Sequence, residues 1–212
     1  MRPGVIIFTD GSLRVKEAKH YAGYGVVILN PKTGKYITTS GTLSDDNESI
    51  VYCEAWAIYR AFQYLSSNPE MLKKNRNILV VTDNKINVQT FNVWIKYVWD
   101  TSNWFSWKRA DKKTEVRNQA LYRRILRLID QLEVSVRFVH IHSHTKSRDK
   151  IREDLKKCKV VPSEDNIELF SKMNNLADKL ASDETAKLAN SNFIRMRRKR
   201  LKGGEKVGNG KW

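Results

Sequence analysis

The first forty residues alternate apolar runs with turn residues, a pattern typical of β-strands. A continuous apolar run over residues 5–9 predicts a strand covered on both faces, and the turn-forming residues 10–12 follow it. Residues 23–29 predict a second strand. Residues 30–34, which contain proline and glycine, predict a hairpin turn into a third strand over residues 35–42. We therefore expect the chain to begin with three strands joined by hairpins.

Farther along the chain the apolar spacing becomes helical, and helices alternate with two more strands. These strands are expected over residues 78–82 and 134–141. The expected helices cover residues 52–65, a tryptophan-rich stretch from about 88 to 107, residues 116–132, and residues 175 to about 188. This order predicts an α/β fold with a mixed five-stranded sheet, three antiparallel strands and then two parallel strands, flanked by helices.

One connection is longer than this plan needs. Residues 145–174 separate the last strand from the last helix, whereas most connections in compact domains are much shorter. Ile151 and Leu155 are one helical turn apart, and Ser163 is followed by two acids in a pattern typical of a helix start. We expect this insertion to contain helices of its own.

Positive charge dominates the composition and is concentrated near the C-terminus. The 212 residues contain 39 Lys and Arg against 23 Asp and Glu, a net charge of +16. Such an excess favours a polyanionic partner, because bound Lys and Arg release counterions from phosphates. We predict one domain over residues 1–190 and a flexible basic tail over residues 191–212. The tail is either a non-specific nucleic-acid anchor or a contact for another protein.

The sequence also indicates a compartment. No run reaches 18 apolar residues and the opening residues do not form a signal peptide, so we expect neither a membrane span nor secretion. Cys53 and Cys158 are too few for a disulfide framework. An intracellular protein is expected, in the cytoplasm, in the nucleoid or, if the protein is viral, in the host cytoplasm.

Four acids occupy positions that should face the sheet. Asp10 and Asp83 each follow a buried strand, and neighbouring strand ends lie about 5–10 Å apart. Glu54 adjoins the apolar stripe of the first helix, and Asp178 lies in the first turn of the predicted last helix. Carboxylates gathered in this way repel one another unless a cation lies between them. Oxygen ligands without a Cys or His set suit Mg²⁺ or Mn²⁺.

The motifs around these acids resemble, in order and spacing, the four signatures of the ribonuclease H family. They read Ile-Phe-Thr-Asp-Gly-Ser over residues 7–12, Cys-Glu-Ala-Trp-Ala-Ile over 53–58, Val-Val-Thr-Asp-Asn over 80–84 and Asn-Asn-Leu-Ala-Asp over 174–178. The resemblance covers roughly residues 4–189. Residues 88–118, which mix tryptophans with basic residues, look like the basic protrusion of the cellular type 1 branch.

This resemblance implies a ribonuclease H-like fold and an endonuclease that hydrolyses the RNA strand of RNA–DNA hybrids with two divalent ions, Mg²⁺ or Mn²⁺. Asp10 would bridge both ions, Glu54 and Asp83 would complete one, and Asp178 would complete the other. His144 matches the loop histidine that assists proton handling and product release. The implied protein is a monomer, and replication or reverse-transcription proteins could contact its tail or insertion.

The resemblance also assigns contacts to the hybrid. Gly11 and Ser12 lie beside Asp10, where they could meet the sugars in the minor groove. Ser49 and Asn118 match the family's phosphate pocket for the DNA strand. The aromatic and basic residues of the protrusion suit a phosphate track with stacking. They are Trp94, Lys96, Trp99, Trp107, Lys108, Arg109, Lys112 and Lys113.

Several alternatives stay open at this stage. The tryptophans could pack the protrusion instead of binding nucleic acid, and the histidines at 140, 142 and 144 could form a zinc site with Cys158. The acids at 149, 154 and 183, close in sequence to Asp178, could each be ordinary surface acids, and Cys53 is interpreted as a packed thiol. For the whole chain, the alternatives are a non-catalytic nucleic-acid-binding or assembly module and a DNA-cleaving resolvase or transposase-like nuclease.

Overall fold

The structure is a computed structural model that describes residues 3–16, 19–43, 49–100, 102–109, 112–143, 145 and 147–203. For residues 105–109, 112–113 and 192–203 it describes the backbone alone. Among the described residues, no helix combines the length and apolar character needed to cross a membrane.

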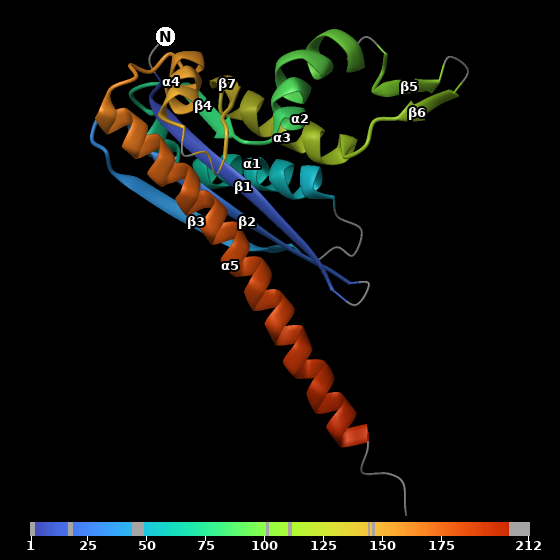
Figure 1. The fold of residues 1–212 in the computed structure, drawn as a ribbon. Coiled ribbons are helices and arrows are strands. Elements are labelled where there is room, and N and C mark those ends of the chain that lie inside the picture. The colour runs from blue at the N-terminus through green and yellow to red at the C-terminus, as the bar shows by residue number, and fades with distance from the viewer. Residues whose placement is uncertain are drawn as a thin grey trace, which may run out of the picture.

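Five strands form one mixed sheet, as the sequence predicts (Figure 1). The order across the sheet is β3-β2-β1-β4-β7. The strands β1, β2 and β3 pair antiparallel, while β4 pairs parallel with both β1 and β7. Their bounds are Val5–Lys16 for β1, Lys19–Leu29 for β2, Tyr36–Leu43 for β3, Asn77–Thr82 for β4 and Ser135–His140 for β7.

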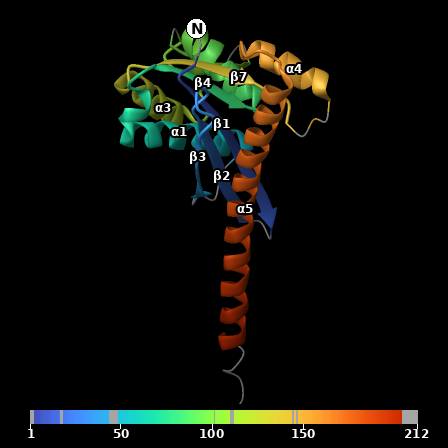
Figure 2. The same cartoon turned by 90° about the vertical axis from the view of Figure 1, so that its left-hand side faces the viewer.

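Helices cover both faces of the sheet (Figure 2). Helices α1 and α3 pack on one face, and α4 and α5 pack on the other. A short 3₁₀-helix follows α1, and a π-helix continues α2. The helical bounds are Ile50–Ser67 for α1, Pro69–Leu72 for the 3₁₀-helix η1, Lys85–Gln89 for α2, Thr90–Trp99 for the π-helix η2, Gln119–Gln131 for α3, Arg148–Lys157 for α4 and Glu164–Gly203 for α5.

The continuous apolar runs of the central strands fill both layers of the core. Because successive side chains of a strand point to opposite faces, Val5 and Ile7 of β1 pack towards α1 and α3. Ile6 and Phe8 of the same strand pack towards α4 and α5, where the Phe8 ring meets the Phe170 ring edge-on at 5.1 Å. The residues of β1 that precede Asp10 are therefore packed on both faces of the sheet.

Strand β1 does not end at Asp10, where turn residues led us to expect a turn. It continues to Lys16 because β2 remains paired with it all the way, from Ile6 opposite Leu29 to Lys16 opposite Lys19. The parallel partner β4 does end here, since its last pair joins Thr9 with Thr82. Asp10 thus lies at the end of the β1–β4 pairing but inside the β1–β2 hairpin.

The predicted helix over residues 88–107 is shorter than expected. It starts at Lys85 and ends at Trp99, and a hairpin of β5 (Phe105–Arg109) and β6 (Lys112–Glu115) follows. Asn103 and Trp104 adopt positive φ angles of 52° and 62°, which a right-handed helix cannot accommodate. The protrusion is therefore a helix followed by a two-stranded hairpin.

The last helix is longer than its predicted bounds of 175–188. Helix α5 starts at Glu164, where the Ser163 side chain accepts a hydrogen bond from the Asn166 N–H, and it runs to Gly203. The insertion 145–174 therefore contains α4 and the first turns of α5, which confirms that it has helices of its own. Residues 191–203, predicted as the start of a flexible tail, continue α5 beyond the sheet (Figure 1), and residues 204–212 lie outside the described residues.

Candidate active site

Asp10 and Asp83 are neighbours because the parallel pairing of β1 with β4 ends just before them. Thr9 pairs with Thr82, so each aspartate is the next residue of its chain. The Asn84 N–H then donates to the Thr82 hydroxyl at 3.1 Å, and the Asn84 side chain caps α2. This tight turn fixes the chain directly after Asp83.

Glu54 reaches the same point because α1 approaches β1 closely at Gly11. A Cβ atom on Gly11 would collide with the backbone of Cys53 and Glu54, so the contact requires glycine there. The Glu54 side chain is buried, and the Thr82 hydroxyl donates a hydrogen bond to its Oε2 at 3.4 Å. The close approach thus places a buried carboxylate beside the two strand-end acids.

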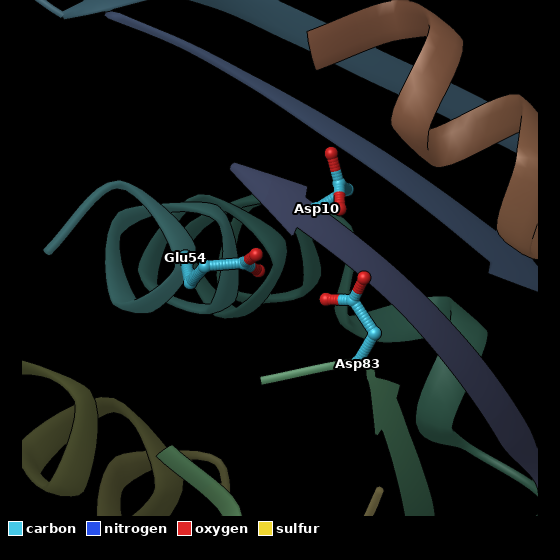
Figure 3. Close-up of side chains that lie close together, drawn as sticks. All are labelled: Asp10, Glu54 and Asp83. Atoms are coloured by element: carbon cyan, nitrogen blue, oxygen red, sulfur yellow. The ribbon is translucent and has the colours of Figure 1, made fainter. Parts of the chain in front are cut away.

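The three carboxylates form one cluster where the pairing of the central strands β1 and β4 ends (Figure 3). One oxygen from each of Asp10, Glu54 and Asp83 lies within 4.8 Å of the other two. The residues come from β1, from α1 and from the end of β4. Three separate elements therefore place their acids at one point, as the sequence predicted for these residues.

Asp178 approaches this cluster from α5, but it lies outside the group of mutually close oxygens. It lies in the middle of α5 and not in a first turn, since α5 begins at Glu164. Gly25 of β2 pairs with Asp10, and a Cβ atom on Gly25 would collide with the Ala177 carbonyl. This contact brings α5 down onto the sheet opposite Asp10, near enough for the charge of Asp178 to raise the pKa of Asp10.

Burial and mutual repulsion disfavour the charged forms of Asp10 and Glu54. Burial, together with the charges of Asp83 and Asp178, raises the pKa of Asp10 from its ordinary value of 3.8 to about 8. Burial and the charges of Asp10 and Asp83 raise the pKa of Glu54 well above its ordinary value, and a hydrogen bond with Gly11 opposes the rise only in part. A cation between the acids would remove this repulsion.

The donor set fits a hard divalent cation. The cluster offers carboxylate oxygens alone, which suit Mg²⁺ or Mn²⁺ better than zinc. No other group of three His, Cys, Asp or Glu side chains within the described ranges is close enough to hold a metal ion. His144, one of the histidines of the zinc alternative, lies outside the described residues.

The predicted DNA-strand residues Ser49 and Asn118 line one cavity of about 340 Å³. Ser49 caps α1, where it accepts a hydrogen bond from the Tyr52 N–H, and Asn118 precedes α3 with a positive φ of 61°. Trp94 and Trp99 line the same cavity. The structure therefore joins the predicted phosphate pocket to the base of the protrusion.

Trp99 has mainly a packing role, in agreement with the alternative that the tryptophans pack the protrusion. It is 9% exposed, and its ring lies 5.7 Å from the ring of buried Trp104 and 5.8 Å from that of Trp94. Lys96 is exposed on the same helix. The side chains of the predicted hairpin residues lie outside the described residues; these are Trp107, Lys108, Arg109, Lys112 and Lys113.

Gly11 and Ser12 lie next to Asp10 on β1, and α5 covers the strand from the other side. The Ser12 carbonyl accepts a hydrogen bond from the Thr185 hydroxyl of α5 at 3.3 Å.

Cys53 is completely buried, as expected for a packed thiol. Cys158 is also buried, and burial raises the pKa of its thiol to about 12.

One of the acids that could have been an ordinary surface acid is buried. Asp154 of α4 has a side-chain exposure of 4% and contacts His142, just beyond the end of β7. Its place next to Leu155, which the helical spacing already marked as apolar-facing, was a signal of burial. Asp149, on the same helix, is a surface acid with a side-chain exposure of 89%.

Comparison with known proteins identifies the fold and the family. The family model described as RNase H matches residues 2–186. A search of curated proteins finds no match. Three solved structures illustrate the structural similarity, each covering most of both chains. The first is a foamy viral protease-reverse transcriptase in complex with dsDNA, with a TM-score of 0.58 and 19% identity over 86% of this chain and 94% of that one. The second is LC11-RNase H1, isolated from compost by a metagenomic approach, in complex with an RNA/DNA hybrid, with a TM-score of 0.53 and 18% identity over 86% of this chain and 97% of that one. The third is the N-terminal RNase H domain of rv2228c from Mycobacterium tuberculosis, with a TM-score of 0.52 and 15% identity over 88% of this chain and 96% of that one.

Proposed function

The chain belongs to the ribonuclease H family, and from this premise we propose that it is an endonuclease that hydrolyses the RNA strand of RNA–DNA hybrids. The observation that carries the proposal is the cluster of Asp10, Glu54 and Asp83, with carboxylate oxygens within 4.8 Å of one another. A binding module has no need of three acids held together against their own repulsion on a protein of net charge +16. The cluster therefore favours catalysis over a non-catalytic role.

Two divalent ions, Mg²⁺ or Mn²⁺, fit this proposal. Asp10, Glu54 and Asp83 would hold one of them, and Asp10 with Asp178 would hold the other. Bound ions would neutralise the charge that develops on the scissile phosphate and favour the attack of water. The need for a cation is supported by the raised pKa values of Asp10 and Glu54, because both must ionise to bind one.

The chain's own residues hold these acids in place. The Thr82 hydroxyl and the Gly11 backbone hydrogen bond to Glu54 and orient its carboxylate. Gly25 lets α5 lie close to β2, which brings Asp178 towards Asp10. The geometry of the site thus depends on two glycines and one threonine in addition to the acids.

Hybrid recognition is proposed to start at the cavity of Ser49 and Asn118. Hydroxyl and amide groups can donate hydrogen bonds to a phosphate of the DNA strand, and the cavity of about 340 Å³ is large enough to admit one. The solved complex of LC11-RNase H1 contains an RNA/DNA hybrid, which supports the same class of substrate here. The DNA strand would then run from the cavity along the protrusion.

The test is a cleavage assay with end-labelled RNA–DNA hybrid, double-stranded RNA and double-stranded DNA, each with Mg²⁺ or with EDTA. We expect only the RNA strand of the hybrid to be cut, and only with the metal. Asp10→Asn should lose cleavage while it binds the hybrid within about tenfold of the wild type, because binding depends mainly on the basic surface. Lys96→Ala, an exposed position away from the acids, is the control that should weaken binding and leave the chemistry intact.

Other outcomes would point to the other two functions. Binding of the hybrid without cleavage in any metal would indicate a non-catalytic module. Cleavage of double-stranded DNA in place of the hybrid would indicate a resolvase or transposase-like nuclease. Retained turnover in Asp10→Asn would contradict the assignment of the acids.

A further inference from the structure

The insertion before α5 carries a buried acid that the proposed chemistry does not use. Asp154 of α4 has a side-chain exposure of only 4%. Its Oδ2 accepts a hydrogen bond from the His142 backbone N–H at 2.7 Å and lies 3.0 Å from Nδ1 of the same histidine. The Lys157 ammonium, one turn along α4, lies 2.8 Å from Oδ1. One carboxylate therefore binds both the main chain and the ring of His142.

These contacts keep Asp154 charged despite its position. Burial opposes ionisation, but the hydrogen bonds from Lys157 and from the backbone and ring of His142 outweigh it and hold the pKa of Asp154 below its ordinary value. Charge-assisted hydrogen bonds are stronger than neutral ones, and a buried carboxylate without partners would be costly. Asp154 is thus a firm anchor for His142.

His142 lies two residues beyond the end of β7 and two residues before His144. The Ile141 N–H donates to the Thr82 carbonyl at 3.0 Å, so this part of the chain runs beside the residue that precedes Asp83. Four residues, 143–146, then lead to Ser147, whose side chain caps α4. The loop is therefore attached at both ends to α4, by Asp154 at His142 and by the helix cap at Ser147.

Helix α4 is itself fixed to the core. Leu155 and Cys158 are completely buried in the same hydrophobic cluster as Ile141. The Arg137 guanidinium of β7 donates hydrogen bonds to the carbonyls of Lys157 and Cys158 at the end of the helix. Because α4 is fixed to the core, the contact between Asp154 and His142 holds the chain at His142 in a defined position.

We propose that Asp154 is a positioning residue, which fixes the chain at His142, two residues before the histidine to which the family resemblance assigns proton handling. This inference rests on the proposed function, because the role of His144 comes from the resemblance to the ribonuclease H family. It gives the insertion a role: α4 supplies an anchor for the loop that follows β7. The side chain of Asp154 is held by protein groups and has no need to touch the substrate.

The test compares Asp154→Ala with Asp154→Asn and with the control Asp149→Asn. Asp149 lies on the same helix, is 89% exposed and pairs with Arg152, so its replacement changes the charge of α4 without touching the loop. We expect Asp154→Ala to lower kcat by about tenfold to a hundredfold with KM unchanged, because misplacement of about 1 Å has effects of that size. Asp154→Asn keeps an acceptor for the His142 N–H and should recover part of the loss, and Asp149→Asn should match the wild type.

A double-mutant cycle with His144→Ala separates positioning from general destabilisation. If Asp154 acts through the loop histidine, its replacement should have little further effect on kcat once His144 is absent. An equal loss of kcat in both backgrounds, or an Asp154→Ala variant as active as the wild type, would overturn the proposal.

Amide hydrogen exchange gives a readout that does not need activity. Exchange across residues 142–147 should be faster in Asp154→Ala than in the wild type or in Asp149→Asn, and unchanged exchange there would also overturn the proposal. A wild type that never cuts the hybrid would refute the proposed function, whereas the exchange measurement would still decide whether Asp154 anchors the loop.

Discussion

At the residue scale, Asp10 has the most to gain from a bound cation. It lies between Asp83 and Asp178, and its pKa of about 8 means that near neutral pH the metal-free protein largely retains a proton there. A cation competes with that proton for the same carboxylate. Binding of a divalent ion should therefore release protons and strengthen as the pH rises towards 8.

The raised pKa also predicts how stability depends on pH. Folded Asp10 binds its proton more tightly than unfolded Asp10, whose pKa is near the ordinary 3.8, so its contribution to stability is fully present below about pH 4 and is lost as the pH rises through about 8. In EDTA, Asp10→Asn should match the wild type near pH 4 and melt several degrees higher near pH 8, since each kcal/mol shifts the melting temperature by about 2–4 °C in a protein of this size. Calorimetry from pH 4 to 9 measures the difference, and a constant difference across that range would contradict it.

A second prediction at this scale concerns Gly25. Gly25→Ala would place a Cβ atom against the Ala177 carbonyl and push α5 away from β2, so Asp178 should move away from Asp10. We expect a lower melting temperature and a loss of kcat of about tenfold or more, since the catalytic geometry tolerates little displacement. Cleavage kinetics and thermal unfolding measure both effects.

Met173→Ala is the matched control for Gly25→Ala. Met173 is almost completely buried in the layer between α5 and the sheet, and its truncation should cost about 2–5 kcal/mol without pushing the helix outwards. If it lowers kcat as much as Gly25→Ala, the role of the close approach at Gly25 in placing Asp178 is refuted.

At the scale of elements, the sequence predicted what side-chain periodicity controls. The five strands and the helices α1 and α3 follow from apolar spacing, and the order of elements allows only a few topologies. Three of the four predicted acids converge because each directly follows an apolar run or adjoins an apolar helix face, and both patterns can be recognised before any tertiary contact is known. Asp178 was assigned by its motif, and its approach to Asp10 depends on a helix–strand contact at Gly25 that periodicity does not reveal.

The points that the sequence mispredicted or left open depend on features that local residue patterns do not reveal. Turn residues at 10–12 do not end β1, because β2 offers it a partner as far as Lys16. The burial of Asp154 requires His142 and Lys157 to meet it, and no local pattern shows that pairing. The helix after residue 88 ends at backbone angles of Asn103 and Trp104 that their residue types do not require.

At the scale of the whole molecule, charge should determine how the protein holds nucleic acid. Helix α5 continues past the sheet to Gly203 and carries a dense basic segment in its last turns. The backbone of α5 carries this segment beyond the sheet and away from the strands that bear the acids (Figure 1). We propose that this segment is a non-specific nucleic-acid anchor.

Removal of residues 193–212 should therefore weaken hybrid binding and leave kcat unchanged. The slope of log K against log salt concentration should flatten by about one unit for each phosphate that the shortened protein no longer neutralises. Neutral replacement of Arg195, Arg197, Arg198 and Arg200 by glutamine keeps the length of the chain and should give a smaller change in the same direction, because four of the eight basic residues remain. An unchanged slope in both variants would refute the anchor and favour a protein partner for the tail.

The most direct test of the central claim is the location of Mn²⁺ by anomalous scattering in crystals of the protein soaked with that ion. We predict two peaks, one among the carboxylates of Asp10, Glu54 and Asp83 and one between Asp10 and Asp178, and no peak at either place in Asp10→Asn. Crystals with saturating Mn²⁺ and no anomalous density among these acids would contradict the account.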